Sequence, residues 1–311
     1  MCKELRDDSL QFGTFSRGAL CPSRREKGLL GRKLRGVFFA GQGRGNLMSA
    51  TLDDAKAATR GTSVAQTRPA SPARYVFVDV WRGLAIIGVV LYHFGWDLNF
   101  FGFISPAVMF SGPVTIFARA LAGSFMFLAG VSLVLAHESN VRWRKFLVRL
   151  AKLVAAAAAI SIITYVLFPE GFIYFGILHA IALASVLGLA FLPLPTGLIL
   201  LAALVMLAAP FFFETSTFDT RILAWIGFAA NPPMANDFVP VFPWFGVTLA
   251  GMGCTRLFLS RQTAGHTSQK PAEGALTRAL VWIGKRTLPI YLLHQPLLFG
   301  GFVAFTRLAA T

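Results

Sequence analysis

Three histidines of this 311-residue chain lie inside long apolar stretches: His93, His179 and His294. An ionisable side chain in hydrocarbon is costly, so such residues usually face the interior of a helix bundle and take part in function. A neutral imidazole can take a proton from a hydroxyl or amine, or carry an acyl group itself. These histidines are therefore the first candidates for chemistry.

His93 belongs to a stripe of ionisable residues on one expected helix. Asp79 and Arg82 are neighbours on one helix face, and His93 follows Arg82 by roughly 16 Å along the same face. Asp97 is one further turn along. A carboxylate at this spacing can fix an imidazole tautomer, and the arginine can meet an anionic group such as a nucleotide phosphate. Asp79 and Arg82 equally suit a structural pair at a helix start, and Asp97 a solvated boundary residue.

The composition predicts an integral membrane protein. The chain is 55% hydrophobic and 14% charged, with a mean hydropathy of +0.63, whereas soluble domains have about 25% charged residues. The formal net charge of +15 is concentrated in the N-terminal part and in short loops, which is typical of membrane topology and disfavours a nucleic-acid partner. The three cysteines have no metal-binding spacing, so neither a metal site nor a disulfide framework is expected.

The expected fold is an all-α polytopic bundle with seven or eight transmembrane helices. Residues 1–72 are basic and polar, and we expect a disordered cytoplasmic tail, of which 1–47 precede an alternative start at Met48. Residues 73–311 form the expected membrane domain. Residues 221–230 are too short to cross alone and suggest a re-entrant or interfacial helix. The apolar runs predict spans at 79–98, 113–136, 147–168, 172–192, 196–213, 239–259 and 287–306.

Lysine and arginine set the expected orientation. The N-terminal part and the 137–146 and 260–286 loops are basic, hence cytoplasmic. The 99–112 loop and the 168–171 turn carry no lysine or arginine, and the 214–238 loop carries only Arg221, so these three are expected outside. This distribution predicts a multi-pass protein of the cell inner membrane with its N-terminus in the cytoplasm.

Four sequence blocks resemble bacterial relatives of heparan-alpha-glucosaminide N-acetyltransferase. They lie at 74–98, 174–182, 240–246 and 288–296, within a likeness that covers 74–308. The resemblance implies a membrane enzyme that passes an acetyl group from cytosolic acetyl-CoA to a sugar on the far side. In the animal enzyme the histidine assigned as catalytic lies in the loop after the first span, but the 99–112 loop here has none. A catalytic role for His93 is therefore inferred from the stripe.

Other candidate residues come from the later spans. His294, with Tyr291 and Gln295, offers polar groups to a midplane cavity, whereas His179 equally suits an interhelical hydrogen bond. Lys285 and Arg286 at the cytoplasmic mouth suit CoA phosphates, although positive-inside anchoring also explains them. Trp244 is interpreted first as an interfacial belt residue and second as a sugar platform.

The sequence therefore predicts acetyl transfer with His93, Asp97 and His294 as catalytic residues. The acceptor is an amino or hydroxyl group of a sugar or surface glycan, and a homodimer is left open. The spacing of Arg82 and His93 also resembles that of integral-membrane polysaccharide O-acyltransferases, which usually have more spans. Two rivals remain: a proton-coupled transporter, and a haem protein with paired histidine ligands.

Overall fold

The computed structural model describes residues 75–137, 140–261 and 274–309. The expected tail, residues 1–72, lies outside this part of the chain. The described residues are helical apart from loops and two isolated bridges, one of which joins Phe175 to Phe238. The helices are α2 (Val76–Phe100), α3 (Pro106–Met109), α4 (Gly112–His137), α5 (Trp143–Leu167), α6 (Ile177–Phe191), α7 (Thr196–Ala208), α8 (Val241–Arg261), α9 (Ala275–Gly284) and α10 (Thr287–Ala309).

Each of the seven predicted spans overlaps one α-helix of the structure. Among the described helices, α2, α4, α5 and α10 are long and apolar enough to cross a membrane. The helices α6 and α7 have 15 and 13 residues, fewer than the 20 or so that a span needs. A total of seven or eight crossings thus stays a prediction. The expected short helix over 221–230 is wrong, because this stretch contains a single 3₁₀ turn, Ala224–Ile226.

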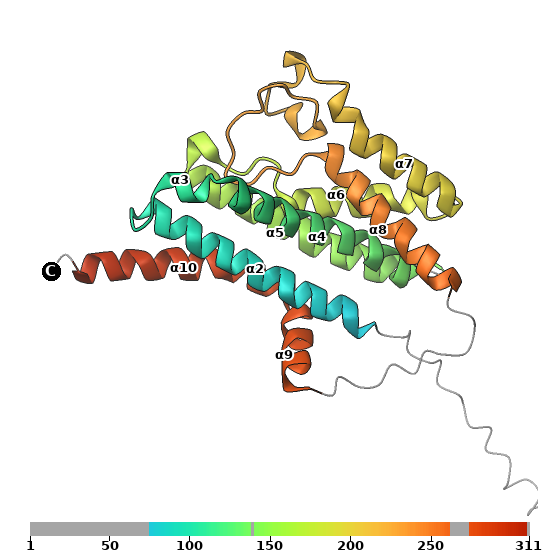
Figure 1. Cartoon of the computed structure of the whole chain (residues 1–311), viewed down its shortest axis with the longest axis horizontal. Helices are drawn as coiled ribbons and strands as arrows, with labels where there is room; N and C mark the ends of the chain where they lie inside the picture. The colour runs from blue at the N-terminus through green and yellow to red at the C-terminus, as the bar shows by residue number, and fades with distance from the viewer. Residues whose placement is uncertain (1–74, 138–139, 262–273, 310–311) are drawn as a thin grey trace, which may run out of the picture. The chain divides into compact units, whose positions relative to one another are not determined.

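The helices form two groups that share α4. In one group α4 packs on α6 and α8, and α7 packs on α8. In the other, α2 contacts α4, α9 and α10, with α10 beside α2 and the short α9 running crosswise to both (Figure 1). The helix α5 packs on α6. The tight contact of α4 with α8 depends on Gly130 and Gly251. A Cβ on Gly130 would lie 2.0 Å from the carbonyl oxygen of Thr248, and one on Gly251 would lie 2.3 Å from that of Phe127.

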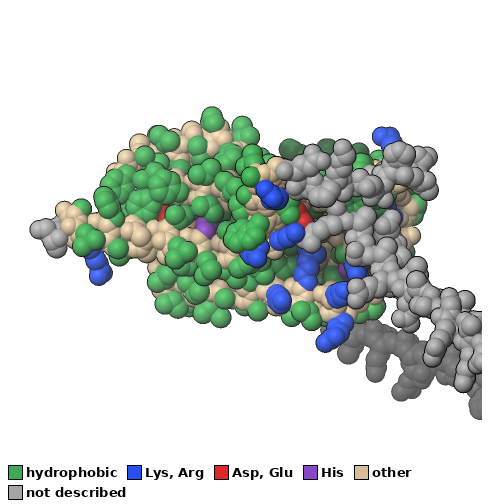
Figure 2. Space-filling model, turned by 90° about the horizontal axis from the view of Figure 1, so that it is seen from below, with side chains coloured by type: hydrophobic (Ala, Val, Ile, Leu, Met, Phe, Trp, Pro, Cys, Tyr) green, Lys and Arg blue, Asp and Glu red, His purple; other side chains and the backbone are tan. Residues whose placement is uncertain are grey.

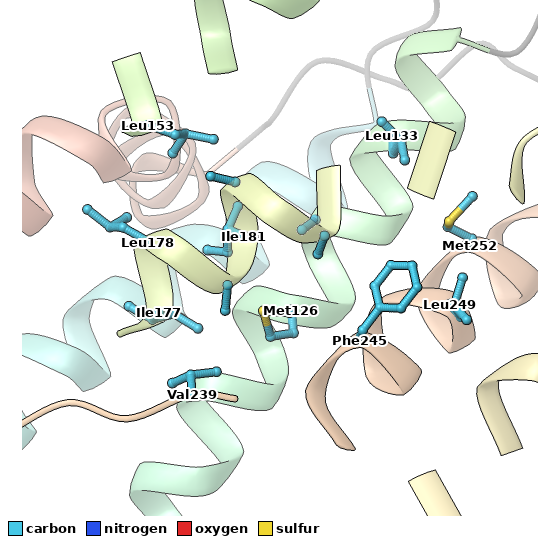
Figure 3. Packing of buried hydrophobic residues seen from close by; sticks show 14 of the residues in the cluster. Met126, Leu133, Leu153, Ile177, Leu178, Ile181, Val239, Phe245, Leu249 and Met252 are labelled. Atoms are coloured by element: carbon cyan, nitrogen blue, oxygen red, sulfur yellow. The ribbon is translucent and has the colours of Figure 1, made fainter. Parts of the chain in front are cut away.

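The apolar core lies between α4, α6 and α8. Figure 3 shows part of this core, with Met126 from α4, Ile181 from α6 and Leu249 from α8. All three side chains are buried. The surface is also apolar. Figure 2 shows hydrophobic side chains over much of one face, with lysine and arginine gathered toward one end. An apolar exterior with charge at one end is typical of a protein that faces lipid.

Candidate functional site

A cavity of about 1110 Å³ opens between α2, α4, α5, α6 and the start of α10. Its basic residues come from α2, from the first half of α5 with the preceding residue, and from the residue after α9, and its apolar residues include side chains of α4, α6 and α10. Asp79 is the acidic residue among the described lining residues. The basic lining residues are Arg82, Arg142, Arg144, Lys145, Arg149, Lys152 and Lys285; the apolar lining includes Phe125, Leu128, Ile177, Leu178 and Leu288.

Among the described residues, Asp79 and Ser132 hydrogen-bond to Arg82 in the cavity wall. One guanidinium nitrogen, Nη1, donates to Asp79 Oδ1 at 3.3 Å, and Nη2 donates to the hydroxyl of Ser132 on α4. Ser132 in turn donates to the carbonyl of Leu128. The predicted pair of Asp79 and Arg82 is thus present, and both residues line the cavity.

The helix α9 lies directly against the first turns of α2. A Cβ on Gly284 would lie 1.9 Å from the carbonyl oxygen of Asp79, so only glycine permits this approach. The contact places Lys285, the next residue, in the cavity wall. Arg286 instead covers the ring of Trp282 at 4.2 Å and is not among the lining residues.

A basic face of α5 was missed by the sequence prediction. Lys145, Arg149 and Lys152 follow a spacing of four and three residues, which puts them on one side of a helix. The sequence analysis used Lys145 for topology and left Arg149 and Lys152 unassigned within a span. Arg149 lies close enough to Arg82 for their charges to repel. A concentration of like charge in one cavity is relieved by a bound anion.

His93 on α2 and His294 on α10 contact each other. Their ring centroids are 4.9 Å apart at an interplanar angle of 62°. His294 Nδ1 lies 2.6 Å from the carbonyl oxygen of Tyr291, so Nδ1 carries the proton and donates it. Nε2 then holds a lone pair, and it is buried without a partner among the described residues. In its neutral form His294 therefore has a buried basic nitrogen, Nε2, without a described partner.

Asp97 joins α2 to α10 rather than contacting His93. Its Oδ1 accepts a hydrogen bond of 2.8 Å from Gln295 Nε2, and among the described residues no hydrogen bond joins Asp97 to His93. Asp97 is 0% exposed, so the alternative of a solvated boundary residue is wrong. Asp97 Oδ2 and Gln295 Oε1 are buried acceptors without described donors. Two such acceptors beside the histidine pair suit a ligand that carries N–H or O–H groups.

Tyr291 connects the cavity with the histidine pair. It lines the cavity, and its ring centroid is 5.5 Å from that of His294. Neither His93 nor His294 belongs to the cavity wall. Tyr291 is thus a cavity residue in contact with one member of the histidine pair.

Comparison with known protein families gives a match over most of the chain. Residues 74–296 match the family described as heparan-alpha-glucosaminide N-acetyltransferase, catalytic. The chain belongs to this family. The match includes every residue of the cavity wall and extends to Gln295. No curated protein and no solved structure matches the chain. The family implies an acetyltransferase, and the apolar helices indicate that this member lies in a membrane.

His179 and Trp244, two of the predicted site residues, contact neighbouring protein groups and do not line the cavity. His179 accepts a hydrogen bond from the Gly176 amide on Nδ1, and its Nε2 lies 3.2 Å from Ser161 Oγ on α5. Both ring nitrogens are therefore engaged, which favours the structural alternative. Trp244 packs against the core near Gly123 and does not line the cavity.

One acidic residue that sequence reasoning missed lies next to the site. Asp237, in the loop before α8, accepts a hydrogen bond of 2.8 Å from the Ile177 amide at the start of α6. Burial raises the pKa of Asp237 to about 6, although this hydrogen bond opposes the rise. Asp237 lies three residues before the sequence block 240–246, and no sequence pattern indicated its role.

Proposed function

We propose that the chain is an inner-membrane acetyltransferase that moves an acetyl group from cytosolic acetyl-CoA to an amino or hydroxyl group of a sugar or surface glycan. The observation that carries this proposal is the cavity, which has a basic part, an apolar part and a histidine pair behind its wall. The N-terminus lies in the cytoplasm in this proposal, because the basic cavity then faces the compartment that holds acetyl-CoA.

The basic part suits the phosphates of CoA. Arginine and lysine form charge-assisted hydrogen bonds to phosphate oxygens. Arg149, Lys152 and Lys285 come from two different elements, so a multiply charged anion can contact several of them at once. Arg82 is already fixed by Asp79 and Ser132 and can bind without much loss of side-chain freedom.

The apolar part suits the uncharged arm of CoA and its thioester. It leads to Tyr291 and thus toward the imidazoles. In the transfer, the acceptor nitrogen or oxygen attacks the thioester carbon, the new bond forms, and the carbon–sulfur bond breaks. His294 Nε2 takes the proton of the acceptor and passes it to the leaving CoA sulfur. His93, in contact with that ring, shares the proton in this direct course. In the alternative course His93 attacks the thioester carbon, the carbon–sulfur bond breaks and CoA leaves as the thiol with the imidazole proton; the acceptor then attacks the acetyl-imidazole and frees His93.

Asp97 and Gln295 complete this arrangement. Their hydrogen bond fixes α10 against α2, and so fixes His294 against His93. Their two unpaired oxygens can accept hydrogen bonds from the acceptor. The same contact between the rings disfavours the haem rival, because no space for a macrocycle lies between them.

The test is release of free CoA thiol by the purified full chain in lipid nanodiscs, given acetyl-CoA and either amino sugars or neutral glycans. Amino sugars and neutral glycans separate N-transfer from the polysaccharide O-acyltransferase alternative. We expect His294→Ala to lower the rate by about two to four orders of magnitude and His93→Ala by a comparable factor. His137→Ala, a histidine at the basic end of α4, is the matched control.

Two results would contradict the proposal. One is a wild-type rate in both His93→Ala and His294→Ala. The other is uptake of a substrate into proteoliposomes without thiol release, which would favour the transporter.

A further inference from the structure

Tyr291 is the cavity-lining residue of α10 that lies nearest in sequence to His294. Leu288, one turn earlier, also lines the cavity, and Gln295 follows one turn later on the same helix face. The ring centroid of Tyr291 is 5.5 Å from that of His294, and the Tyr291 carbonyl accepts the hydrogen bond from His294 Nδ1. One face of α10 therefore leads from the cavity wall through Tyr291 to the histidine pair.

The phenol hydroxyl of Tyr291 is open to a ligand. It makes no hydrogen bond to any of the described residues, and its oxygen is not among their sealed polar atoms. A phenol carries one O–H donor, which is satisfied by whatever acceptor reaches it. Because Tyr291 lines the cavity, that acceptor can be a group of the substrate.

The unpaired groups beside His294 are acceptors of hydrogen bonds. Asp97 Oδ2, Gln295 Oε1 and His294 Nε2 are buried without described partners, and each presents a lone pair. They suit the N–H or O–H group of an acceptor substrate, but they repel a carbonyl oxygen that gains negative charge. Tyr291 adds a donor next to this group of acceptors.

We propose that Tyr291 is a catalytic residue whose hydroxyl donates a hydrogen bond to the carbonyl oxygen of the thioester. This inference rests on the proposed function. When the acceptor attacks the thioester carbon, one electron pair of the carbonyl moves onto its oxygen, and a donor stabilises that charge. The carbonyl then re-forms, the carbon–sulfur bond breaks, and the sulfur leaves with the proton that His294 carries. The phenol keeps its own proton throughout.

This role does not depend on the course of the transfer. If His93 attacks the thioester first, the same oxygen becomes negative, and it does so again when the acceptor attacks the acetyl-imidazole. The surrounding wall includes the apolar side chains of Leu178 and Leu288. Apolar surroundings lower the local dielectric constant, so a hydrogen bond to a developing charge is stronger there than in water.

The first experiment compares Tyr291→Phe with Tyr92→Phe in the assay of CoA thiol release. Tyr92 is the matched control, since its ring centroid lies 5.5 Å from that of His93 but the residue does not line the cavity. Both variants keep the aromatic ring and lose the hydroxyl. We expect Tyr291→Phe to lower kcat by about two orders of magnitude with KM for acetyl-CoA unchanged, because the hydrogen bond strengthens only as the charge develops. Tyr92→Phe should match wild type.

The second experiment does not require turnover. In acetyl-carba-CoA a methylene group replaces the thioester sulfur, so the carbonyl is a ketone that cannot lose CoA. Infrared difference spectra with a carbon-13 label on this carbonyl give its stretching frequency in the bound state. A hydrogen bond weakens the carbonyl bond, so we expect a lower frequency in wild type and Tyr92→Phe than in Tyr291→Phe.

A lowered kcat and a raised carbonyl frequency in Tyr291→Phe together support the inference. A wild-type kcat in Tyr291→Phe overturns it and leaves the proposed function intact. A lowered kcat with the wild-type carbonyl frequency also overturns it, because the hydroxyl then acts elsewhere than on the carbonyl. A wild-type protein that releases no CoA thiol with any acceptor refutes the proposed function itself.

Discussion

The raised pKa of Asp237 predicts that one substitution stabilises the protein in a pH-dependent way. The pKa moves from 3.8 to about 6. The folded state therefore binds more protons than the unfolded state between these values, and the free energy of unfolding falls as the pH rises from about 4 to 6. Above pH 6 the folded protein bears the full cost of the buried charge, which is about 3 kcal/mol for two pKa units.

Asp237→Asn removes that cost while it keeps an acceptor for the Ile177 amide. Water reaches part of this side chain, so the expected gain is about 1–3 kcal/mol at pH 8 and near zero at pH 4. The assay is reversible unfolding of the purified chain in mixed detergent at both pH values, with Asp219→Asn as control. A gap between wild type and Asp237→Asn that is equal at both pH values would refute the linkage argument. Lower stability of Asp237→Asn at pH 8 would refute it as well.

Two further predictions concern the cavity. Arg149→Gln should raise KM for acetyl-CoA about tenfold with kcat unchanged, because a charge-assisted hydrogen bond to phosphate is worth about 1.5 kcal/mol. Steady-state kinetics test this, with Arg278→Gln, at an exposed position, as the control. Equal KM values for Arg149→Gln and wild type would contradict the prediction. Gly284→Val should push α9 off α2, raise the same KM and lower the unfolding free energy by about 1–3 kcal/mol. Gly274→Ala, at the start of α9 where a Cβ has space, is the control and should change neither KM nor the unfolding free energy. If Gly284→Val keeps the wild-type values of both, the close contact between α9 and α2 is contradicted.

The long helices were predictable because a run of apolar residues long enough to span lipid leaves few alternatives. Each predicted span overlaps a helix of the structure. The helix α9 was not predicted, since its ten residues mix apolar and basic side chains and are too short for a span. It forms where a glycine lets it lie on α2, which is a tertiary contact that hydropathy does not register.

Contacts of the site within one helix could be predicted from residue spacing, whereas contacts between two helices could not. The spacing of Asp79 and Arg82 predicted their pair correctly. The spacing of His93 and Asp97 suggested a contact, yet the partner of Asp97 is Gln295, almost two hundred residues later. The basic face of α5 could have been found from its helical spacing. Asp237 could not, because its partner belongs to a loop and helix start sixty residues earlier.

Within α10, all of which is described, His294 is the one buried side chain. A helix with so little of its surface enclosed by protein takes its tilt largely from the surrounding bilayer. The hydrogen bond between Asp97 and Gln295 holds α10 to α2, together with ring contacts of Phe299 and Phe302 near the end of α2. We therefore expect lipid acyl length to affect the alignment of the two imidazoles, so that a bilayer that is too thin or too thick lowers the turnover of the proposed reaction.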